Sequence, residues 1–235
     1  MKRHIPNGIT LLNLIFGCCA VGAIFYGDFM TAFWCLLAAA LADFADGFAA
    51  RMLGVSSPLG KELDSLADMI SFGFAPGAIY YHLLLIAFDI EASGTIHLIG
   101  VPAFIVTAFS CLRLAKFNLD TRQSDSFIGL PTPASTLFAV GVLLIYYYNS
   151  FGLGDLMINP IFLFVCIVVL SFLLVAEIPM FSLKFKSFGW KGNEVRFIFA
   201  GITLLLLIFT KEAAFLLIIL LYIIFSIISH LKRAG

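Results

Sequence analysis

The chain has 235 residues, of which 62% are hydrophobic and 12% are charged, and its mean hydropathy is +1.07. Soluble domains carry about 25% charged residues, so this composition excludes a soluble cytosolic enzyme, a disordered chain and a nucleic-acid binder with a basic face. Fourteen basic and fourteen acidic residues cancel, which leaves no net charge to steer a partner. The composition predicts a single polytopic membrane domain over residues 1–235.

Eight apolar stretches approach the length of about 20 residues that crosses a bilayer, of which the fifth and the seventh are short. We therefore predict an all-α transmembrane helix bundle of about eight spans. The expected spans are Gly8–Phe25, Phe29–Leu53, Leu63–Ala87, Ile96–Phe117, Pro133–Tyr148, Pro160–Ile178, Val195–Thr210 and Ala213–His230.

The basic residues predict the orientation of these spans. With eight spans both termini lie on one side, and every Lys and Arg except Lys211 falls on that side. Loops rich in Lys and Arg stay in the cytoplasm. We expect an integral protein of the cell (inner) membrane with cytoplasmic termini.

Four carboxylates interrupt two apolar stretches: Asp43 and Asp46 near the end of the second, and Asp64 and Asp68 near the start of the third. An aspartate at the centre of a membrane helix costs about 2.5–3.5 kcal/mol on insertion scales. Spacings of three and four residues place each pair on one helix face. Because the connection between the stretches is short, the helices are expected to be antiparallel neighbours and the two pairs to converge.

Four converging carboxylates cannot all ionise without counter-charge. Arg51 and Lys61 are the basic residues closest in sequence, and two flexible cations match four acids poorly. Carboxylate-only sites suit hard divalent ions such as Mg²⁺ or Mn²⁺, and pairs of such ions recur in phosphoryl chemistry. The acids predict a divalent-cation site; structural ion pairs or a proton path are the alternatives.

Residues 43–68 read D-x-x-D-G-x-x-A-R, eight residues, G, three residues, D, three residues, D. This pattern resembles the signature of the CDP-alcohol phosphotransferases at every fixed position and spacing. The resemblance implies an all-helical membrane enzyme that joins a CDP-activated donor to an alcohol and releases CMP. It also implies two bound divalent cations and, for many members, a homodimer.

The resemblance assigns roles to individual residues. It makes the four aspartates the metal ligands and Asp68 the general base. It places Gly47, Ala50, Arg51 and Gly60 beside the CDP, together with Asp43. Asn7, Thr10 and Asn13 follow one another at spacings of three, so they share one side of the first helix. That side could donate hydrogen bonds to cytidine or diphosphate, or could serve capping and packing.

Segments outside the signature indicate the acceptor. Residues 5–13, 113–118, 127–134 and 178–184 resemble the bacterial and archaeal phosphatidylserine synthases within this family. The implied substrates are CDP-diacylglycerol and L-serine. Arg113 and Lys116 share a helix face and could bind the serine carboxylate or a lipid phosphate, or only fix the topology. Asn118 is a further polar group that could reach the acceptor.

Three other functions remain open from the sequence. The acceptor could be glycerol 3-phosphate, inositol phosphate or choline. The acids could form the ion site of a cation transporter, although such a site belongs near the membrane midplane, whereas these acids lie toward the cytoplasmic ends of their spans. The chain could also be an inactive scaffold, which would gain nothing from four costly charges.

Overall fold

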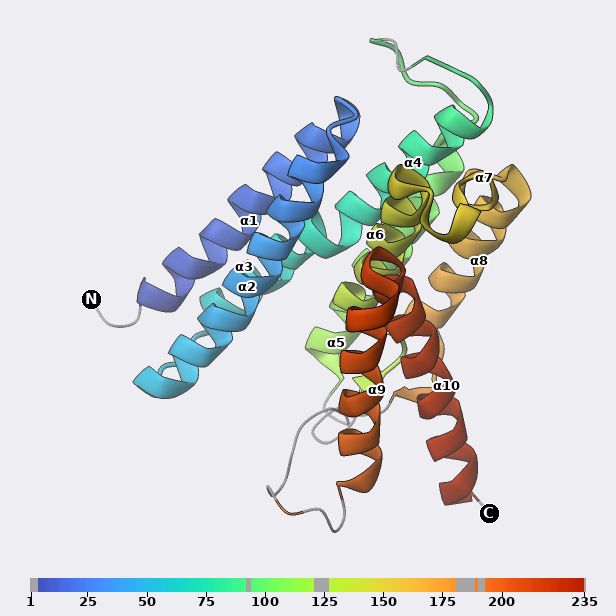
Figure 1. The fold of residues 1–235 in the computed structure, drawn as a ribbon. Coiled ribbons are helices and arrows are strands. Elements are labelled where there is room, and N and C mark those ends of the chain that lie inside the picture. The colour runs from blue at the N-terminus through green and yellow to red at the C-terminus, as the bar shows by residue number, and fades with distance from the viewer. Residues whose placement is uncertain (1–3, 92–93, 121–126, 181–188, 190–192, 235) are drawn as a thin grey trace.

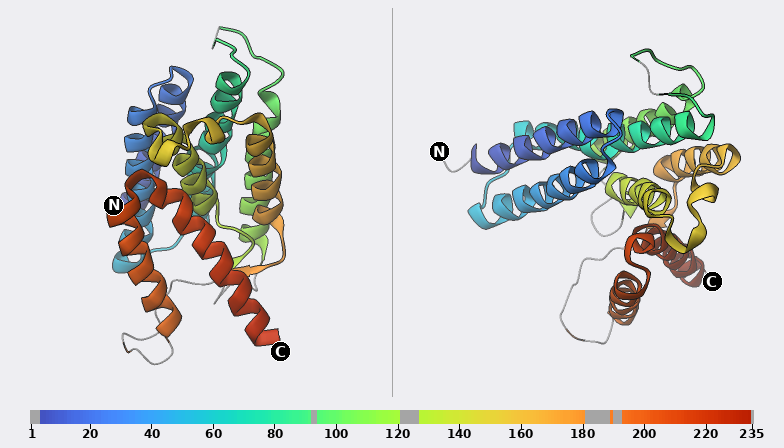
Figure 2. Two further views of the ribbon diagram at one scale, coloured as in Figure 1. Left: turned by 45° about the vertical axis from the view of Figure 1, so that its right-hand side comes forward. Right: turned by 45° about the horizontal axis from the view of Figure 1, so that its top comes forward.

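The computed structural model describes residues 4–91, 94–120, 127–180, 189 and 193–234, and it is almost entirely helical, as predicted (Figure 1). The long helices cross the molecule side by side in a bundle (Figure 2). In chain order the helices are α1 (His4–Phe25), α2 (Phe29–Leu53), α3 (Pro58–Asp68), the π-helix η1 (Met69–Phe74), α4 (Ala75–Ala87), η2 (Val101–Ala103), α5 (Phe104–Leu119), α6 (Thr132–Tyr148), η3 (Ser150–Gly152), α7 (Gly154–Met157), α8 (Pro160–Val175), α9 (Glu194–Thr210), η4 (Lys211–Ala213) and α10 (Ala214–Ala234).

Five helical segments of the described chain are long and apolar enough to cross a membrane, and two shorter apolar helices, α6 and α8, accompany them. The segment Glu194–Ile228 includes both α9 and α10. Its backbone reverses at Lys211, where φ is 46° and ψ is −112°, so α9 and α10 form an antiparallel hairpin (Figure 1). Each of the eight predicted spans thus corresponds to a helix or to a continuous series of helices.

Two predicted spans, the fourth and the sixth, extend beyond the helices that form them. The fourth span was expected to begin at Ile96, but residues 96–100 form turns and irregular chain, and helix begins at Val101. The sixth was expected to reach Ile178, but α8 ends at Val175. Apolar residues that follow or precede a helix cannot be separated from it by hydropathy alone.

Side-chain capping fixes where α2 and α3 begin. Asp28 accepts a hydrogen bond from the Thr31 amide at 3.1 Å, and its contacts with Thr31 hold the pKa of the Asp28 carboxyl below its usual value. Ser57 accepts from the Gly60 amide at 3.0 Å, and Pro58 occupies the first turn. Serine caps and first-turn prolines are typical helix starts. Between the two helices, Gly54 takes the left-handed conformation (φ 62°) that ends α2.

Helix α1 packs against α2, α3 and η1 through one narrow stripe. The buried positions recur every three or four residues and include Thr10, Asn13 and Gly17. A Cβ on Gly17 would collide with Ser71 of η1, so only glycine allows this approach. Small residues in membrane helices permit such close backbone contact. The stripe brings the polar groups of α1 to the start of the third span.

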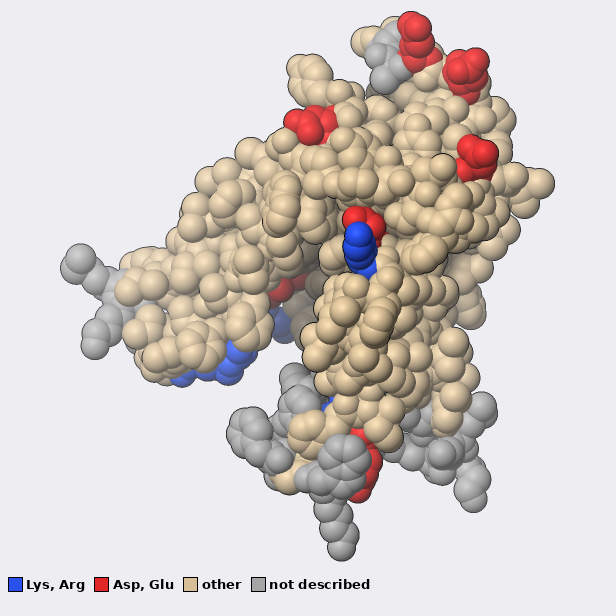
Figure 3. All heavy atoms as spheres, viewed as in Figure 1, with Lys and Arg blue, Asp and Glu red and all other residues tan. Residues whose placement is uncertain are grey.

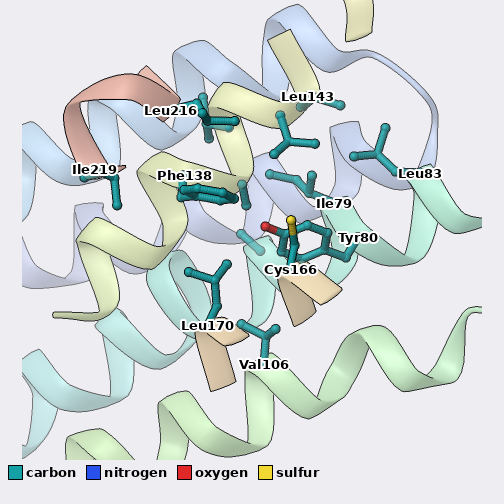
Figure 4. Close-up of a cluster of buried hydrophobic side chains, with 14 of the residues drawn as sticks. Ile79, Tyr80, Leu83, Val106, Phe138, Leu143, Cys166, Leu170, Leu216 and Ile219 are labelled. Atoms are coloured by element: carbon teal, nitrogen blue, oxygen red, sulfur yellow. The ribbon is translucent and has the colours of Figure 1, made fainter. Parts of the chain in front are cut away.

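The apolar core surrounds α4 and α6, whose side chains are buried on nearly every face. Figure 4 shows Ile79 and Leu83 of α4, Leu143 of α6 and Leu170 of α8 converging beside the Tyr80 ring. A helix that is hydrophobic all round belongs in the interior of a bundle. The other helices pack around these two, which places α1–α3 on one side of the molecule and α9–α10 on another (Figure 2).

A short strand pair, which the sequence did not predict, ties the segment before α6 to the segment after α8. Strands β1 (Phe127–Ile128) and β2 (Pro179–Met180) run antiparallel, with Ile128 opposite Pro179. The Gly129 amide donates to the Ile178 carbonyl at 3.0 Å, and the Leu130 amide donates to the Leu173 carbonyl at 2.8 Å. These bonds fix the entry to α6.

Most of the described basic residues gather at one end of the bundle, whereas acidic residues occur at both ends. Asp28, Asp89, Glu91 and Asp155 lie in or beside the connections at the upper end, where Figure 3 shows acidic side chains along the rim, and Lys211 lies in the turn between α9 and α10. Arg51, Lys61, Lys116 and Arg196 lie in or beside the connections at the other end. Lys2, Arg3, Arg122, Lys184, Lys186 and Lys191, and the side chains of Lys232 and Arg233, fall outside the described residues.

The contact between α6 and α10 depends on Gly141. A Cβ on this residue would lie 2.5 Å from the Leu216 amide nitrogen, a backbone atom that cannot move independently. Gly141→Ala should lower the free energy of unfolding in detergent by about 1–3 kcal/mol, the usual cost of overpacking. Gly201→Ala on α9 is the matched control, because no atom lies within 4 Å of its added Cβ. Equal unfolding temperatures for the two variants would contradict this packing.

Candidate active site

The end of α2 and the whole of α3 bring three carboxylates together. Asp43, Asp64 and Asp68 each offer an oxygen, and these oxygens all lie within 4.8 Å of one another. All three side chains are half-buried. The turn at Gly54 reverses the chain, and both helices pack mainly against α1. Three of the four carboxylates predicted to converge thus form one cluster.

Asp46 lies beside this cluster rather than within it. Its side chain is 6% exposed on the face of α2 that packs against α1. There the Thr10 hydroxyl is 2.5 Å from Asp46 Oδ2 and 3.1 Å from the Pro6 carbonyl oxygen, so it can donate to one of them at a time. The structure therefore separates the four predicted ligands into a group of three and a fourth whose oxygen contacts α1.

Asp68 is positioned by a short chain of hydrogen bonds. Asn13 Nδ2 donates to Asp68 Oδ1 at 3.3 Å, and Asn13 Oδ1 accepts from the Ser71 hydroxyl at 2.7 Å. Since Asn13 and Ser71 are fully buried, this chain fixes which amide atom faces the carboxylate. Ser71 was missed in the sequence, where it is one polar residue in an apolar run, although its position three residues after Asp68 was a usable signal.

The π-helix η1 begins directly after Asp68 and widens the third span for six residues. A π-turn leaves backbone carbonyls displaced, and in hydrocarbon each one without a partner costs several kcal/mol. The Phe72 carbonyl accepts the Thr136 hydroxyl of α6 at 3.0 Å, and the Gly73 carbonyl accepts the Thr107 hydroxyl of α5 at 3.0 Å. Neighbouring helices thus stabilise the wide turn, a feature that often marks functional sites.

A cavity of about 230 Å³ opens beside the carboxylates, between α1, the end of α2 and the start of α3. Asp46 and Asp64 form part of its wall, and Lys61 lies at its edge. Of the residues predicted to contact CDP, the cavity wall includes Asn7, Thr10, Gly47, Ala50 and Gly60.

The other three residues predicted to contact CDP are not part of the wall. Asn13 and Asp43 lie with the carboxylate cluster. Arg51 is exposed, and its guanidinium passes close to Gly47, where an added Cβ would lie 3.4 Å from a guanidinium nitrogen. Arg51 is therefore at the mouth of the cavity.

The predicted acceptor residues occupy the end of α5. Arg113 is 7% exposed, with its guanidinium carbon 5.0 Å from the centre of the Phe117 ring. Arg113 and Lys116 line a second cavity of about 280 Å³, which also includes Asp120 and Glu177. Hydrogen bonds from Asn118 to Ser65 and from Lys61 to Asn118 join this end of α5 to α3, the helix that contains Asp64 and Asp68.

Asn118, which was expected to reach the acceptor, forms hydrogen bonds to α3 instead. Its side-chain amide donates to the Ser65 hydroxyl at 2.8 Å, and its backbone carbonyl accepts from Lys61 Nζ at 2.8 Å. Both bonds join the end of α5 to α3. Asn118 therefore fixes the distance between the helix that contains Arg113 and the helix that contains Asp64 and Asp68.

Comparison with known proteins identifies this arrangement. A model of the family described as CDP-alcohol phosphatidyltransferase matches residues 3–175. The chain belongs to this family. All four aspartates, the small cavity and the end of α5 lie inside the matched segment, so the resemblance based on residues 43–68 is confirmed.

Three curated relatives of this CDP-alcohol phosphatidyltransferase have the same name. A Bacillus subtilis protein named CDP-diacylglycerol–serine O-phosphatidyltransferase is 34% identical over 193 residues, which cover 82% of this chain and 95% of the relative. A Helicobacter pylori protein of the same name is 34% identical over 231 residues, or 96% and 90% of the two chains. A third, from Methanocaldococcus jannaschii, is 32% identical over 194 residues, or 76% and 87%.

The donor set of the cluster fits a hard divalent cation. Three carboxylate oxygens within 4.8 Å of one another form an oxygen-only site, which suits Mg²⁺ or Mn²⁺ better than softer metals. The carboxylates also lie in membrane helices, where like charges in contact are costly. A bound cation would offset their repulsion.

Divalent ions should stabilise the folded protein. At a Mn²⁺ concentration of about 100 times Kd, the free energy of unfolding should rise by about 2.7 kcal/mol, measured as a higher unfolding temperature in detergent. Asp64→Asn should weaken Mn²⁺ binding at least tenfold. Asp28→Asn, which changes an exposed carboxylate at the other end of α2, should bind like the wild type. Unchanged Mn²⁺ affinity in the Asp64 variant would contradict the metal site.

Proposed function

We propose that this protein transfers the phosphatidyl group of CDP-diacylglycerol to the hydroxyl of L-serine, giving phosphatidylserine and CMP. The observation that carries the proposal is the cluster of Asp43, Asp64 and Asp68 directly beside a cavity lined by the signature residues. The name shared by the relatives supports the donor and the acceptor. Residues 1–235 would then form one catalytic domain.

The cavity between α1, α2 and α3 would hold the CDP group. Gly47, Ala50 and Gly60 leave room there because they have small side chains or none, and Asn7 and Thr10 add polar groups. Arg51 at the mouth would reach a phosphate or the cytidine. Asn13 and Asp43 would lie at the diphosphate end, because both adjoin Asp68.

The four aspartates would hold two divalent cations, Mg²⁺ or Mn²⁺. Asp43, Asp64 and Asp68 form the central group, and Asp46 adds an oxygen at the wall shared with the CDP cavity. When bound, the ions would neutralise the diphosphate and the charge that develops on the departing CMP. Thr10, Asn13 and Ser71 would orient the carboxylates through the hydrogen bonds described above.

The reaction would be a single displacement at phosphorus. Asp68 accepts the proton of the serine hydroxyl, whose oxygen forms a bond to the phosphorus of the phosphatidyl group. The bond between that phosphorus and the oxygen of CMP breaks, and CMP leaves with the electron pair. A base must lie within hydrogen-bond reach of the hydroxyl or one water away, which the partial exposure of Asp68 allows.

The acceptor would bind at the end of α5. The Arg113 guanidinium and the Lys116 ammonium both reach the cavity of about 280 Å³, and a guanidinium can bind a carboxylate through two hydrogen bonds. Asn118 would act by holding α5 against α3. This assigns Arg113 and Lys116 to the serine carboxylate.

The gathering of basic residues at one end of the bundle supports the orientation. The end that includes Arg51, Lys61 and Lys116 would face the cytoplasm of an inner membrane, so that the active site opens to soluble serine. The family resemblance also suggests a homodimer.

A panel of acceptors tests the reaction. Purified protein with CDP-diacylglycerol and Mn²⁺ or Mg²⁺ should release CMP with L-serine, and chelation of the ions should stop the release. Glycerol 3-phosphate, inositol phosphate and choline should give at least tenfold less CMP. Release with one of these alcohols but not with serine would disprove the acceptor and keep the chemistry, whereas no release with any alcohol would disprove the function.

Asp68→Asn should abolish turnover, because the amide cannot accept the proton; loss of a general base costs about 10²–10⁴ in rate. The unfolding temperature should stay close to that of the wild type, since the amide can still accept from Asn13. Asp155→Asn, at the opposite end of the bundle, is the control and should keep full activity. Near-wild-type CMP release by the Asp68 variant would disprove its role as the base.

A further inference from the structure

The α9–α10 hairpin lies outside the segment that the family model matches, which ends at residue 175. It packs mainly against α6, where Leu216 meets Gly141, and it approaches α2 through the Phe33 and Phe215 rings, whose centres are 5.6 Å apart. The residues proposed to bind CDP, metal ions and serine all lie on α1, α2, α3 and α5, so none of them lies on this hairpin.

The hairpin, α2 and α6 together border a third, open cavity of about 420 Å³. Its described walls are almost wholly apolar: Leu36 and Ala40 line it from α2, and Ile218 and Ile219 line it from α10. Thr136 of α6 is one of its few polar side chains, and that hydroxyl already contacts the Phe72 carbonyl. The cavity therefore fits a hydrocarbon ligand and offers little to a polar one.

The cavity continues toward the carboxylate cluster along two elements. On α2, Phe33, Leu36 and Ala40 line the cavity, and Asp43 follows Ala40 by three residues on the same side of the helix. On the third span, Phe72 lines the cavity and follows Asp68 by four residues. One end of the apolar cavity is thus adjacent to the site proposed for the diphosphate.

Tyr222 of α10 adds an aromatic ring to the wall of the cavity. Its ring packs on Phe199 of α9, with ring centres 6.2 Å apart, and the side chain is 6% exposed. Both helices of the hairpin therefore contribute packed aromatic side chains to this wall.

We infer that this cavity holds one acyl chain of the CDP-linked donor, and that the α9–α10 hairpin forms the wall that selects for that chain. The inference rests on the proposed function, since the headgroup of the donor must occupy the neighbouring cavity. An ordinary membrane phospholipid lacks a cytidine group to occupy that cavity. Only a lipid that has both a CDP group and an acyl chain can occupy the polar cavity of about 230 Å³ and the apolar cavity of about 420 Å³ at once.

Filling the cavity tests this inference. Ile219→Trp places a large ring among the wall residues and should raise KM for a dioleoyl CDP-lipid at least tenfold. A dihexanoyl CDP-lipid, which places few carbons there, should change less than twofold, and KM for serine should not change. Leu220→Trp is the matched control, because Leu220 is 41% exposed on α10 and does not line the cavity.

Three outcomes of this experiment are informative. Equal effects of Ile219→Trp on long-chain and short-chain donors would overturn the inference, as would equal effects of the two tryptophan variants. If the wild type releases no CMP from either donor with any acceptor, the proposed function fails, whatever the tryptophan variants do.

A second measurement avoids engineered variants and turnover. Dioleoyl-length CDP-diacylglycerol with a photoactivatable diazirine near one chain end should label peptides from residues 214–228 of the wild type. Excess unlabelled CDP-diacylglycerol should prevent the labelling, and excess phosphatidylcholine should not. Equal labelling by a phosphatidylcholine that has the same diazirine chain would show that bulk lipid fills the cavity, and would overturn the inference.

Discussion

The structure depends on the convergence of carboxylates inside a pair of membrane helices. Asp43, Asp64 and Asp68 repel one another and lose hydration when their helices pack. Because of this repulsion and lost hydration, contacts among the three carboxylates cannot by themselves stabilise the cluster. The neighbouring groups have to fix the acids instead, which explains why the buried stripe of α1 includes the polar residues Thr10 and Asn13 and the small residue Gly17.

The bundle divides this work among its helices. Helices α4 and α6 form an apolar interior that holds the third span in place. Helix α1 supplies the hydrogen bonds to Asp46 and Asp68, and α5 is fixed to α3 by Asn118. The α9–α10 hairpin contacts the opposite side of α6. Between the charged ends of the bundle, most of the face drawn in Figure 3 has no Lys, Arg, Asp or Glu and can face lipid.

Local periodicity explains how much of this could be predicted from the sequence. The eight helical spans and the meeting of Asp43 with Asp64 and Asp68 follow from hydropathy and from helix geometry, because each depends on residues close in the chain. The separate position of Asp46 could not be predicted, since it depends on how α1 packs. Ser71 was missed for the same reason: its partner Asn13 is 58 residues away. The β1–β2 pair likewise joins distant segments that are too short to show a pattern.

The wide turn η1 also sets the rotation of α4 about the helix axis relative to α3. A π-turn contains one residue more than an α-turn, and one residue corresponds to about 100° of helical rotation. Deleting one residue between Met69 and Phe74 would restore regular pitch but rotate α4 by that angle relative to α3. Either Asp64 and Asp68 would then turn away from Asp43, or the apolar side chains around Tyr80 would turn away from the core. The wide turn therefore keeps the face of α3 that holds the aspartates and the apolar faces of α4 aligned with their separate partners.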